Sequence, residues 1–170
     1  MKRIHRLLIG FFLLSTTAIL LGCGEEESIA QQSPVASNGI VLDVYKSESC
    51  GCCGVWTEYM KANGYNIRIH HPDDLNAVKD QYGIAAQWQS CHTAVTENGY
   101  FFEGHIPAKL VSQFLKNPPT NAAGLAVPGM PLGSPGMEVG DRFTPYDIVQ
   151  LNKDGSTTPY ATISEAAQQY

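Results

Sequence analysis

The alternation of apolar and polar residues predicts that the folded part of the chain begins with two strands around a helix. Residues 40–45 (IVLDVY) and 65–70 (YNIRIH) alternate with the period of two that is typical of half-buried strands. Between them the apolar positions recur with helical spacing, and this helix should end near Gly64. Its predicted buried face consists of Val55, Trp56, Tyr59 and Met60.

Two more helices are predicted from the same spacing and from residues that start or stop helices. Residues 72–74 (PDD) should open the second helix and Gly83 should close it, with an apolar face of Leu75, Val78 and Tyr82. Pro107 should start the third helix and Pro118 should end it. Its apolar face is expected to hold Leu110, Val111, Phe114 and Leu115.

A β-hairpin is predicted between the second and third helices. Its strands, 93–96 and 100–103, flank residues 97–99 (ENG), where a glycine turn is expected. The resulting order, β-α-β-α-β-β-α, belongs to the α/β class and matches a thioredoxin-like arrangement. In that arrangement the first two strands are parallel neighbours.

The last third of the chain has a different character. Residues 122–141 (AAGLAVPGMPLGSPGMEVGD) form a long stretch rich in Gly, Pro and Met, and such loops are usually functional or disordered. A C-terminal β-hairpin should follow, with strands at 146–151 and 156–160, and the tail at 166–170 should fray. We therefore expect one thioredoxin-like domain over residues 39–170.

The N-terminus has the pattern of a bacterial export signal. Basic residues precede an apolar run at 7–21, which is short for a membrane span. The run ends in Leu20-Leu21-Gly22-Cys23, which resembles a lipobox, so residues 1–22 are predicted to be a lipoprotein signal peptide.

Cys23 is then the predicted lipidated residue, and residues 23–38 are a predicted flexible tether because they are polar and lack aromatic side chains. Gly24 follows the cysteine, which by resemblance to lipoprotein sorting favours the outer membrane facing the periplasm. The lipid would be the contact with the membrane, because no second long apolar run follows. The chain without residues 1–22 carries 8 basic against 16 acidic residues, and this net charge of −8 argues against nucleic acid as a partner.

The cysteines carry the candidate chemistry. Cys50, Cys52 and Cys53 are too crowded to staple a domain together, so three thiols in four residues indicate a site. They lie between a predicted strand and a predicted helix, and a helix N-terminus favours thiolates. Cys50 and Cys53 form a C-x-x-C pair, which is typical of dithiol redox proteins. The intervening Cys52 instead suits a soft metal ion, or several ions that share bridging sulfurs.

Cys91 precedes the predicted hairpin. In thioredoxin-like folds the corresponding loop faces the N-terminus of the first helix and usually carries a cis-proline, whereas a cysteine is found here. If the fold is thioredoxin-like, Cys91 approaches the other three thiols. His92 could bind or orient a metal ion, and His105 could do the same or serve only as a structural residue.

Further soft ligands are available in the long loop, where Met130 and Met137 are candidate thioether ligands for Cu(I) or apolar anchors. Zn²⁺ accepts four thiolates, but structural zinc sites usually pair two C-x-x-C knuckles. A [4Fe–4S] cluster conflicts with an ordinary export signal, because it would be assembled before secretion. Cu(I) fits clustered thiolates, nearby histidines and a methionine loop in an exported protein.

Four motifs in the same order resemble the CopG-type copper-resistance proteins of Gram-negative bacteria, a family long catalogued as a domain of unknown function. The motifs are CGCCG at 50–54, SCHTA at 90–94, EGHIPA at 103–108 and GLAVPGMPLGSPGME at 124–138. The resemblance covers about residues 40–160. It implies a periplasmic thioredoxin-like domain that binds copper through its cysteines and has a role in copper redox chemistry. The matching positions in this chain are Cys50, Cys52, Cys53, Cys91, His92, His105, Met130 and Met137.

These observations favour a lipid-anchored periplasmic copper-binding protein that holds Cu(I), with Cu(I)/Cu(II) redox activity as a further expectation. Copper efflux or copper-oxidase proteins of the periplasm are the expected protein partners. Two alternatives stay open. One is a thiol–disulfide oxidoreductase in which Cys50 attacks and Cys53 resolves. The other is a passive chaperone that hands Cu(I) to an efflux system.

Overall fold

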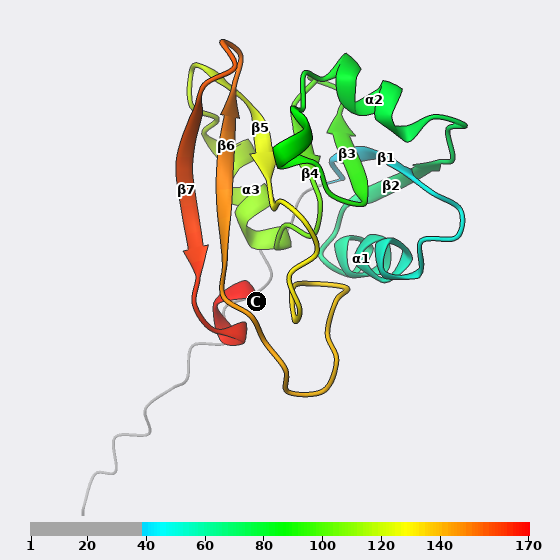
Figure 1. Cartoon of the computed structure of the whole chain (residues 1–170), viewed down its shortest axis with the longest axis vertical. Helices are drawn as coiled ribbons and strands as arrows, with labels where there is room; N and C mark the ends of the chain where they lie inside the picture. The colour runs from blue at the N-terminus through cyan, green and yellow to red at the C-terminus, as the bar shows by residue number, and fades with distance from the viewer. Residues whose placement is uncertain (1–38) are drawn as a thin grey trace, which may run out of the picture. The chain divides into compact units, whose positions relative to one another are not determined.

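The computed structural model describes residues 39–170, and the predicted segments 1–22 and 23–38, including Cys23, lie outside the described residues. The strands form one sheet with helices packed against it (Figure 1). In chain order the elements are β1 (Val41–Lys46), α1 (Gly51–Ala62), β2 (Asn66–His70), α2 (Leu75–Gln81), η1 (Ala86–Trp88), β3 (His92–Thr96), β4 (Phe101–Glu103), α3 (Ala108–Lys116), β5 (Ala122–Ala126), β6 (Tyr146–Asn152), β7 (Thr157–Ile163) and η2 (Ala166–Gln169).

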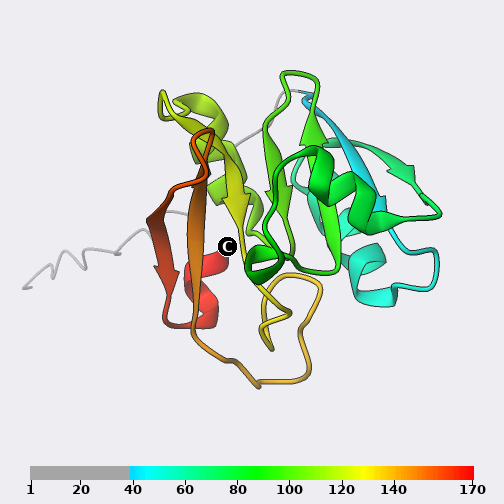
Figure 2. The ribbon, with the colours of Figure 1, turned by 45° about the horizontal axis from the view of Figure 1, so that its top comes forward.

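The sheet has seven strands in the spatial order β2-β1-β3-β4-β5-β6-β7 (Figure 2). β1 and β2 are parallel neighbours, as the sequence predicts. β3 pairs with β1 and β4 pairs with β3, both in antiparallel orientation. β5 lies parallel to β4, and the β6–β7 hairpin completes the sheet. The predicted α/β class and the predicted order through α3 are confirmed, while the thioredoxin-like relationship remains an interpretation of this order.

The two faces of the sheet are covered by different helices. Trp56 of α1 and Phe114 of α3 pack in the same buried cluster as Phe102 of β4. The neighbouring Phe101 points to the opposite face, where it packs with Ile84 after α2. Because successive side chains of a strand alternate between faces, α1 and α3 cover one face, and α2 with η1 covers part of the other.

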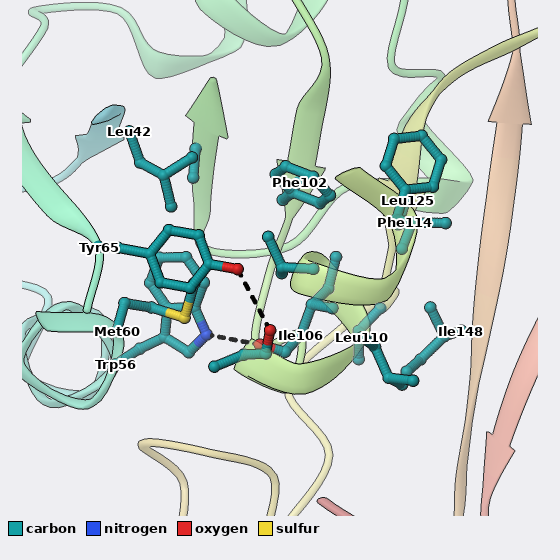
Figure 3. Close-up of a cluster of buried hydrophobic side chains, with 14 of the residues drawn as sticks. Leu42, Trp56, Met60, Tyr65, Phe102, Ile106, Leu110, Phe114, Leu125 and Ile148 are labelled. Carbon is teal, nitrogen blue, oxygen red and sulfur yellow. Dashed lines mark hydrogen bonds between the residues drawn. The ribbon is translucent and has the colours of Figure 1, made fainter. Parts of the chain in front are cut away.

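The larger cluster also satisfies the polar groups of its aromatic side chains (Figure 3). The Trp56 indole N–H donates to the carbonyl of Ile106 at 3.0 Å. The Tyr65 hydroxyl donates to the carbonyl of Ala108 at 3.3 Å. Both bonds tie α1 and the start of β2 to the segment that leads into α3, so the helices on this face are fixed relative to each other.

Local signals explain where the second helix begins and what it buries. Asp74 is the N-cap of α2, and its carboxylate accepts the backbone N–H groups of Asn76 and Ala77. The buried residue of this helix is Lys79, although the pattern predicted an apolar face. On α1 the prediction for Val55 is wrong, because this side chain is 55% exposed while Trp56 and Met60 are buried.

The prediction that residues 122–141 form one loop is wrong at its start. Residues Ala122–Ala126 form β5, which pairs with β4 on one side and β6 on the other. Alanine and glycine have little strand propensity, so the pairing of the neighbours, not the local sequence, creates this strand. Gly124 is required there, because a Cβ would lie 2.1 Å from the carbonyl oxygen of Phe101.

The rest of that segment is an ordered loop, and the tail predicted to fray is folded. Residues Ala166–Gln169 form η2, and Gln169 is fully buried. Its side-chain amide donates to the carbonyl of Gly133 at 2.9 Å and accepts from the Tyr146 hydroxyl at 2.5 Å. The end of the chain therefore holds the loop in place. Within residues 39–170, none of the helices has the length and apolar character that crossing a membrane requires.

Candidate metal centre

The three clustered cysteines lie at the N-terminus of α1. Cys50 is the N-cap and has extended backbone angles, and its side chain makes no capping bond. Cys52 and Cys53 lie in the first turn, where backbone N–H groups have no partner within the helix. These groups and the helix dipole place partial positive charge beside the sulfurs, which favours thiolates and therefore metal binding or thiol exchange.

A disulfide joins Cys50 and Cys53, whose Cα atoms are 5.4 Å apart. The Cys53 side chain is fully buried, while Cys50 is half-buried. Cys52 keeps a free thiol, and its Sγ lies 3.6 Å from that of Cys50. The cluster therefore combines a half-exposed disulfide with a third sulfur at contact distance.

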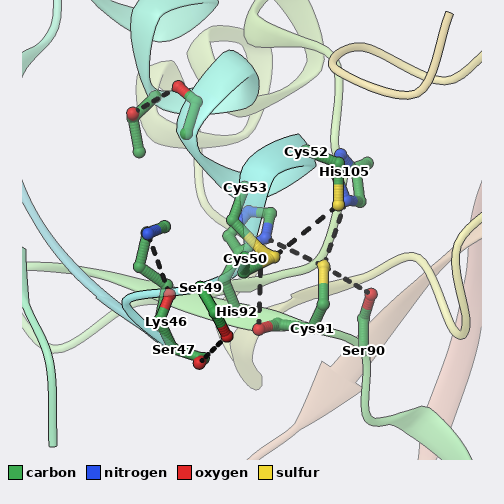
Figure 4. The surroundings of a disulfide bond; sticks show 12 residues. Lys46, Ser47, Ser49, Cys50, Cys52, Cys53, Ser90, Cys91, His92 and His105 are labelled. Atoms are coloured by element: carbon green, nitrogen blue, oxygen red, sulfur yellow. Dashed lines mark hydrogen bonds between the residues drawn. A yellow bond between two sulfur atoms is a disulfide. The ribbon is translucent and has the colours of Figure 1, made fainter.

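The structure brings Cys91 to this cluster from the segment before β3 (Figure 4). The Cys53 Sγ lies 3.7 Å from the carbonyl oxygen of Cys91. The sulfur atoms of Cys50, Cys52, Cys53 and Cys91 all lie within 4.8 Å of one another. Four sulfurs at this spacing can surround one soft ion or bridge several.

Cys91 is also part of a second group of ligand atoms, formed with His92 and His105. Its Sγ lies 3.1 Å from Nε2 of His105 and 3.4 Å from Nδ1 of His92. Burial, with the neighbouring Cys52 as the second cause, raises the pKa of Cys91 to about 11. A metal ion bound at this sulfur must displace a proton.

The orientation of His105 is fixed by the long loop. Its Nδ1 lies 2.8 Å from the carbonyl oxygen of Pro135, which can only accept, so Nδ1 carries the hydrogen. Burial lowers the pKa of His105, so the ring is neutral and Nε2 presents a lone pair to Cys91. This arrangement, in which a backbone acceptor orients a ring toward a soft ligand, is common around protein-bound metals. The sequence left open whether His105 faces the cysteines, and the structure places it beside them.

His92 is fully buried against α1. Its ring lies 4.4 Å from the Trp56 ring and meets the His105 ring edge-on at 5.0 Å. Burial lowers its pKa well below the usual range, so the ring is neutral. Its Nε2 is buried without a hydrogen-bond partner among the described residues, which leaves a lone pair or N–H of this ring available.

The long loop covers the first turn of α1 with its backbone. Gly136 has a φ of +85°, and a Cβ there would lie 2.8 Å from the Trp56 nitrogen and 2.9 Å from the Cys52 carbonyl oxygen. Only glycine therefore permits this approach. Met130 is 55% exposed and Met137 is half-buried. The metal-binding role predicted for both methionines stays a prediction.

A buried lysine beside the site was missed by the sequence interpretation. Lys46, at the end of β1, is 5% exposed and lies opposite His92 in the β1–β3 register. Its ammonium donates to the carbonyls of Ser47 at 2.9 Å and Glu48 at 3.5 Å, in the segment that leads to the cysteines. Among residues 39–170 no carboxylate forms an ion pair with it, so only backbone carbonyls compensate its charge, which adds to the effect of burial in lowering the pKa of the neighbouring His92.

A buried ion pair on the opposite face was also missed. Lys79 of α2 pairs with Glu103 of β4, and both side chains are at most 3% exposed. The carboxylate also accepts the Thr93 hydroxyl at 2.5 Å and the backbone N–H of Ser90 at 2.6 Å. Through Ser90 this network fixes the segment that carries Cys91. The available signal was a lysine and a glutamate inside otherwise apolar patterns.

The candidate ligands form two groups that share Cys91: four sulfurs in one, and the Cys91 sulfur with two neutral imidazoles in the other. Thiolate and imidazole ligands suit Cu(I), and they also suit Zn²⁺. Nδ1 of His92 and Nε2 of His105 both lie beside the Cys91 sulfur, where they can share a soft metal ion with it. The residues present therefore fit a bound soft metal.

Comparison with known proteins agrees with this geometry. A family model described as "Protein of unknown function, DUF411" matches residues 88–137, a range that contains Cys91, His92 and His105. Two solved structures of a copper resistance protein, copG, designated Form 1 and Form 2, are each 39% identical to this chain. Each match covers 74% of this chain and 98% of the solved chain, with TM-scores of 0.69 and 0.70. No curated protein gives a significant match. On this identity over nearly the whole solved chain, the protein belongs to the CopG family of copper resistance proteins.

Proposed function

We propose that this protein binds Cu(I) through Cys50, Cys52, Cys53 and Cys91 and contributes to copper tolerance. The observation that carries the proposal is the convergence of these four sulfurs within 4.8 Å in a member of a copper resistance family. His92 and His105 are the candidate nitrogen ligands beside Cys91. The copper ions are the cargo of the site.

The sulfur spacing favours bridging thiolates and more than one copper ion. Cu(I) accepts two or three soft ligands, so four thiolates that are mutual neighbours can each contact two ions. Binding through all four sulfurs requires reduction of the Cys50–Cys53 disulfide, which consumes two electrons and two protons. We include electron transfer between Cu(I) and Cu(II) in the proposal, with a periplasmic efflux or oxidase protein as the partner.

The proposed place of action is the periplasm. The lipobox at Cys23 supports an anchored protein, and Gly24 after it supports the outer membrane. In this location the site would meet copper that enters from outside the cell. The oxidising compartment would also favour the disulfide whenever copper is absent.

Elemental analysis tests the proposal directly. The full chain is exported in copper-fed cells, purified without air, and its copper and zinc content per chain is measured. We expect more than one copper and little zinc, and we expect the Cys52→Ser variant to lose copper and to lower the copper tolerance of the cells. Unchanged copper content and tolerance in that variant would contradict the proposal.

One observation favours a second function, thiol–disulfide exchange. The Cys50–Cys53 disulfide has the polarity that such enzymes need, because Cys50 is half-buried and Cys53 is fully buried. Cys50 would then attack a substrate and Cys53 would resolve the mixed disulfide. A mixed disulfide with another protein that accumulates in Cys53→Ala, in a preparation free of copper, would favour this function over copper binding.

A further inference from the structure

Two cysteines beside the disulfide remain free in the described part of the chain, and they face each other. Cys52 and Cys91 are both half-buried, so a small reagent can reach them. Their sulfurs belong to the group of four that lies within 4.8 Å, and Figure 4 shows the Cys52 sulfur directed at that of Cys91. An S–S bond is about 2.0 Å long, so the two sulfurs must approach each other from at most 4.8 Å, and rotation about Cα–Cβ is the motion available to cysteine side chains.

We propose that Cys52 and Cys91 form a second disulfide, so that the fully oxidised chain holds all four cysteines as two bonds. The pairing follows from the arrangement itself, because Cys50 and Cys53 are already joined. A Cys50–Cys52 bond, although these sulfurs are 3.6 Å apart, would first require that disulfide to break. The bond itself is independent of copper, but its consequence for copper release rests on the proposed function.

The oxidant is a low-molecular-weight disulfide, RSSR. The Cys52 thiolate, in the first turn of α1, attacks one sulfur of RSSR and releases one RS⁻, which leaves a mixed disulfide on Cys52. Cys91 then attacks the Cys52 sulfur and displaces the second RS⁻. The two cysteines lose two electrons to the oxidant, and their two protons end on the two released RSH molecules.

The second bond would withdraw the remaining thiolates from the metal centre. It would also move the Cys91 sulfur away from Nε2 of His105, which now lies 3.1 Å from it. The oxidised site would keep two imidazoles but no thiolate, and a soft ion held mainly by thiolates would be released. Reduction by a dithiol would restore all four ligands, so the redox state of the site would set its copper affinity.

Peptide mapping tests the bond without reference to copper. The copper-free full chain is treated with oxidised glutathione, its remaining thiols are blocked, and the denatured protein is digested with trypsin. Cleavage after lysines places Cys50, Cys52 and Cys53 on the peptide 47–61, and Cys91 on the peptide 80–109. We expect the two peptides to be joined in most molecules and to separate on reduction. In Cys52→Ser they should stay apart, while the Cys50–Cys53 bond persists within 47–61.

Two outcomes would overturn the inference. The peptides could remain separate although Cys50 and Cys53 are oxidised, or the link could persist in Cys52→Ser, which would assign Cys91 to a different partner. A Cu(I) titration of the reduced and the oxidised chain separates this inference from the proposed function. If the reduced chain bound no copper, the proposed function would fail and the disulfide would stand. If the reduced chain bound copper and the link never formed, only the disulfide would fail.

Discussion

Two buried lysines, one on each face of the sheet, differ in what neutralises them. Lys79 of α2 pairs with the buried carboxylate of Glu103 on β4, which also accepts hydrogen bonds from Thr93 and Ser90. Lys46 lies on the α1 face and is bonded to the backbone carbonyls of the segment before Cys50. A buried charge is costly unless an opposite charge or several hydrogen bonds compensate it.

The difference separates a structural network from a binding site. Lys79 and Glu103 neutralise each other, and the carboxylate also accepts hydrogen bonds from Thr93 and Ser90, so the charges of this buried pair are compensated within the fold. The face around Lys46 has an ammonium without a carboxylate partner among the described residues, a buried His92 nitrogen without a partner, and four sulfurs. Anionic thiolates with bound copper would compensate the ammonium, so we interpret Lys46 as the counter-charge of the metal centre.

The largest effect is expected on the free energy of unfolding, when the buried Lys79–Glu103 pair is broken. Lys79→Met leaves the Glu103 carboxylate buried without its cation, and we expect the free energy of unfolding to fall by about 3–5 kcal/mol. Urea denaturation measures this change. Lys61→Met is the matched control, because the Lys61–Glu58 pair is exposed, and it should cost less than about 1 kcal/mol. An equal loss in both variants would show that the buried pair stabilises the fold no more than an exposed pair does.

The next largest effect is expected at the metal centre, on the affinity for Cu(I) rather than on the free energy of unfolding. Cys91→Ser removes the sulfur that both ligand groups share. Loss of a group that only hydrogen-bonds to a metal ligand typically costs ~10–100-fold in affinity, and we expect Cu(I) affinity to fall by more than this. The free energy of unfolding of the copper-free chain should change by about 1 kcal/mol or less. Competition with a Cu(I) chelator measures affinity. Retained affinity would place copper elsewhere.

A smaller effect tests the counter-charge. Lys46→Met keeps the length of the buried stem and removes the charge, so we expect about tenfold weaker Cu(I) binding with little change in stability. Lys46→Arg, which keeps the charge, should bind more tightly than the methionine variant. The interpretation of Lys46 would be wrong if the methionine variant bound copper as well as the unmodified protein does.

The smallest effect concerns the partly exposed charges on β1 and β2, where Asp43 pairs with Arg68 and His70. A hydrogen bond from Arg68 lowers the pKa of Asp43 below its ordinary 3.8, and His70 acts in the same direction. The carboxylate therefore stabilises the fold above about pH 4, and this contribution is lost as the pH falls through its lowered pKa. Asp43→Asn should be slightly less stable than the unmodified protein at pH 7, and the difference should shrink as the pH falls below 3.8. Urea denaturation across this pH range measures the difference, and a difference that did not change with pH would exclude this cause.

Much of the fold could be predicted because its elements carry their own periodicity and end signals. β5 could not, because its sequence of alanine, glycine and leucine becomes a strand only between β4 and β6. The folding of the tail could not be predicted either, because the bonds of Gln169 reach Gly133 and Tyr146, which are distant in sequence. Interactions between distant segments decide both cases.

The candidate site divides in the same way. The three cysteines within four residues are conspicuous in the sequence, and the predicted strand order brings Cys91 to them. The place of His105 depends on the Pro135 carbonyl, 30 residues further along the chain, and no local pattern reports it. Lys79 interrupts an apolar pattern, which is a weak signal, whereas Lys46 at the end of its strand looks like an ordinary surface lysine until the sheet buries it.

The bonds of Gln169 have a practical consequence for labelling the protein. η2 holds the loop whose Pro135 orients His105, so a tag or fluorophore fused after Tyr170 would lie next to a support of the metal centre. The exposed turn at Asp154–Gly155 lies at the opposite end of the β6–β7 hairpin (Figure 1). A reporter inserted there can follow copper uptake without disturbing the residues under observation.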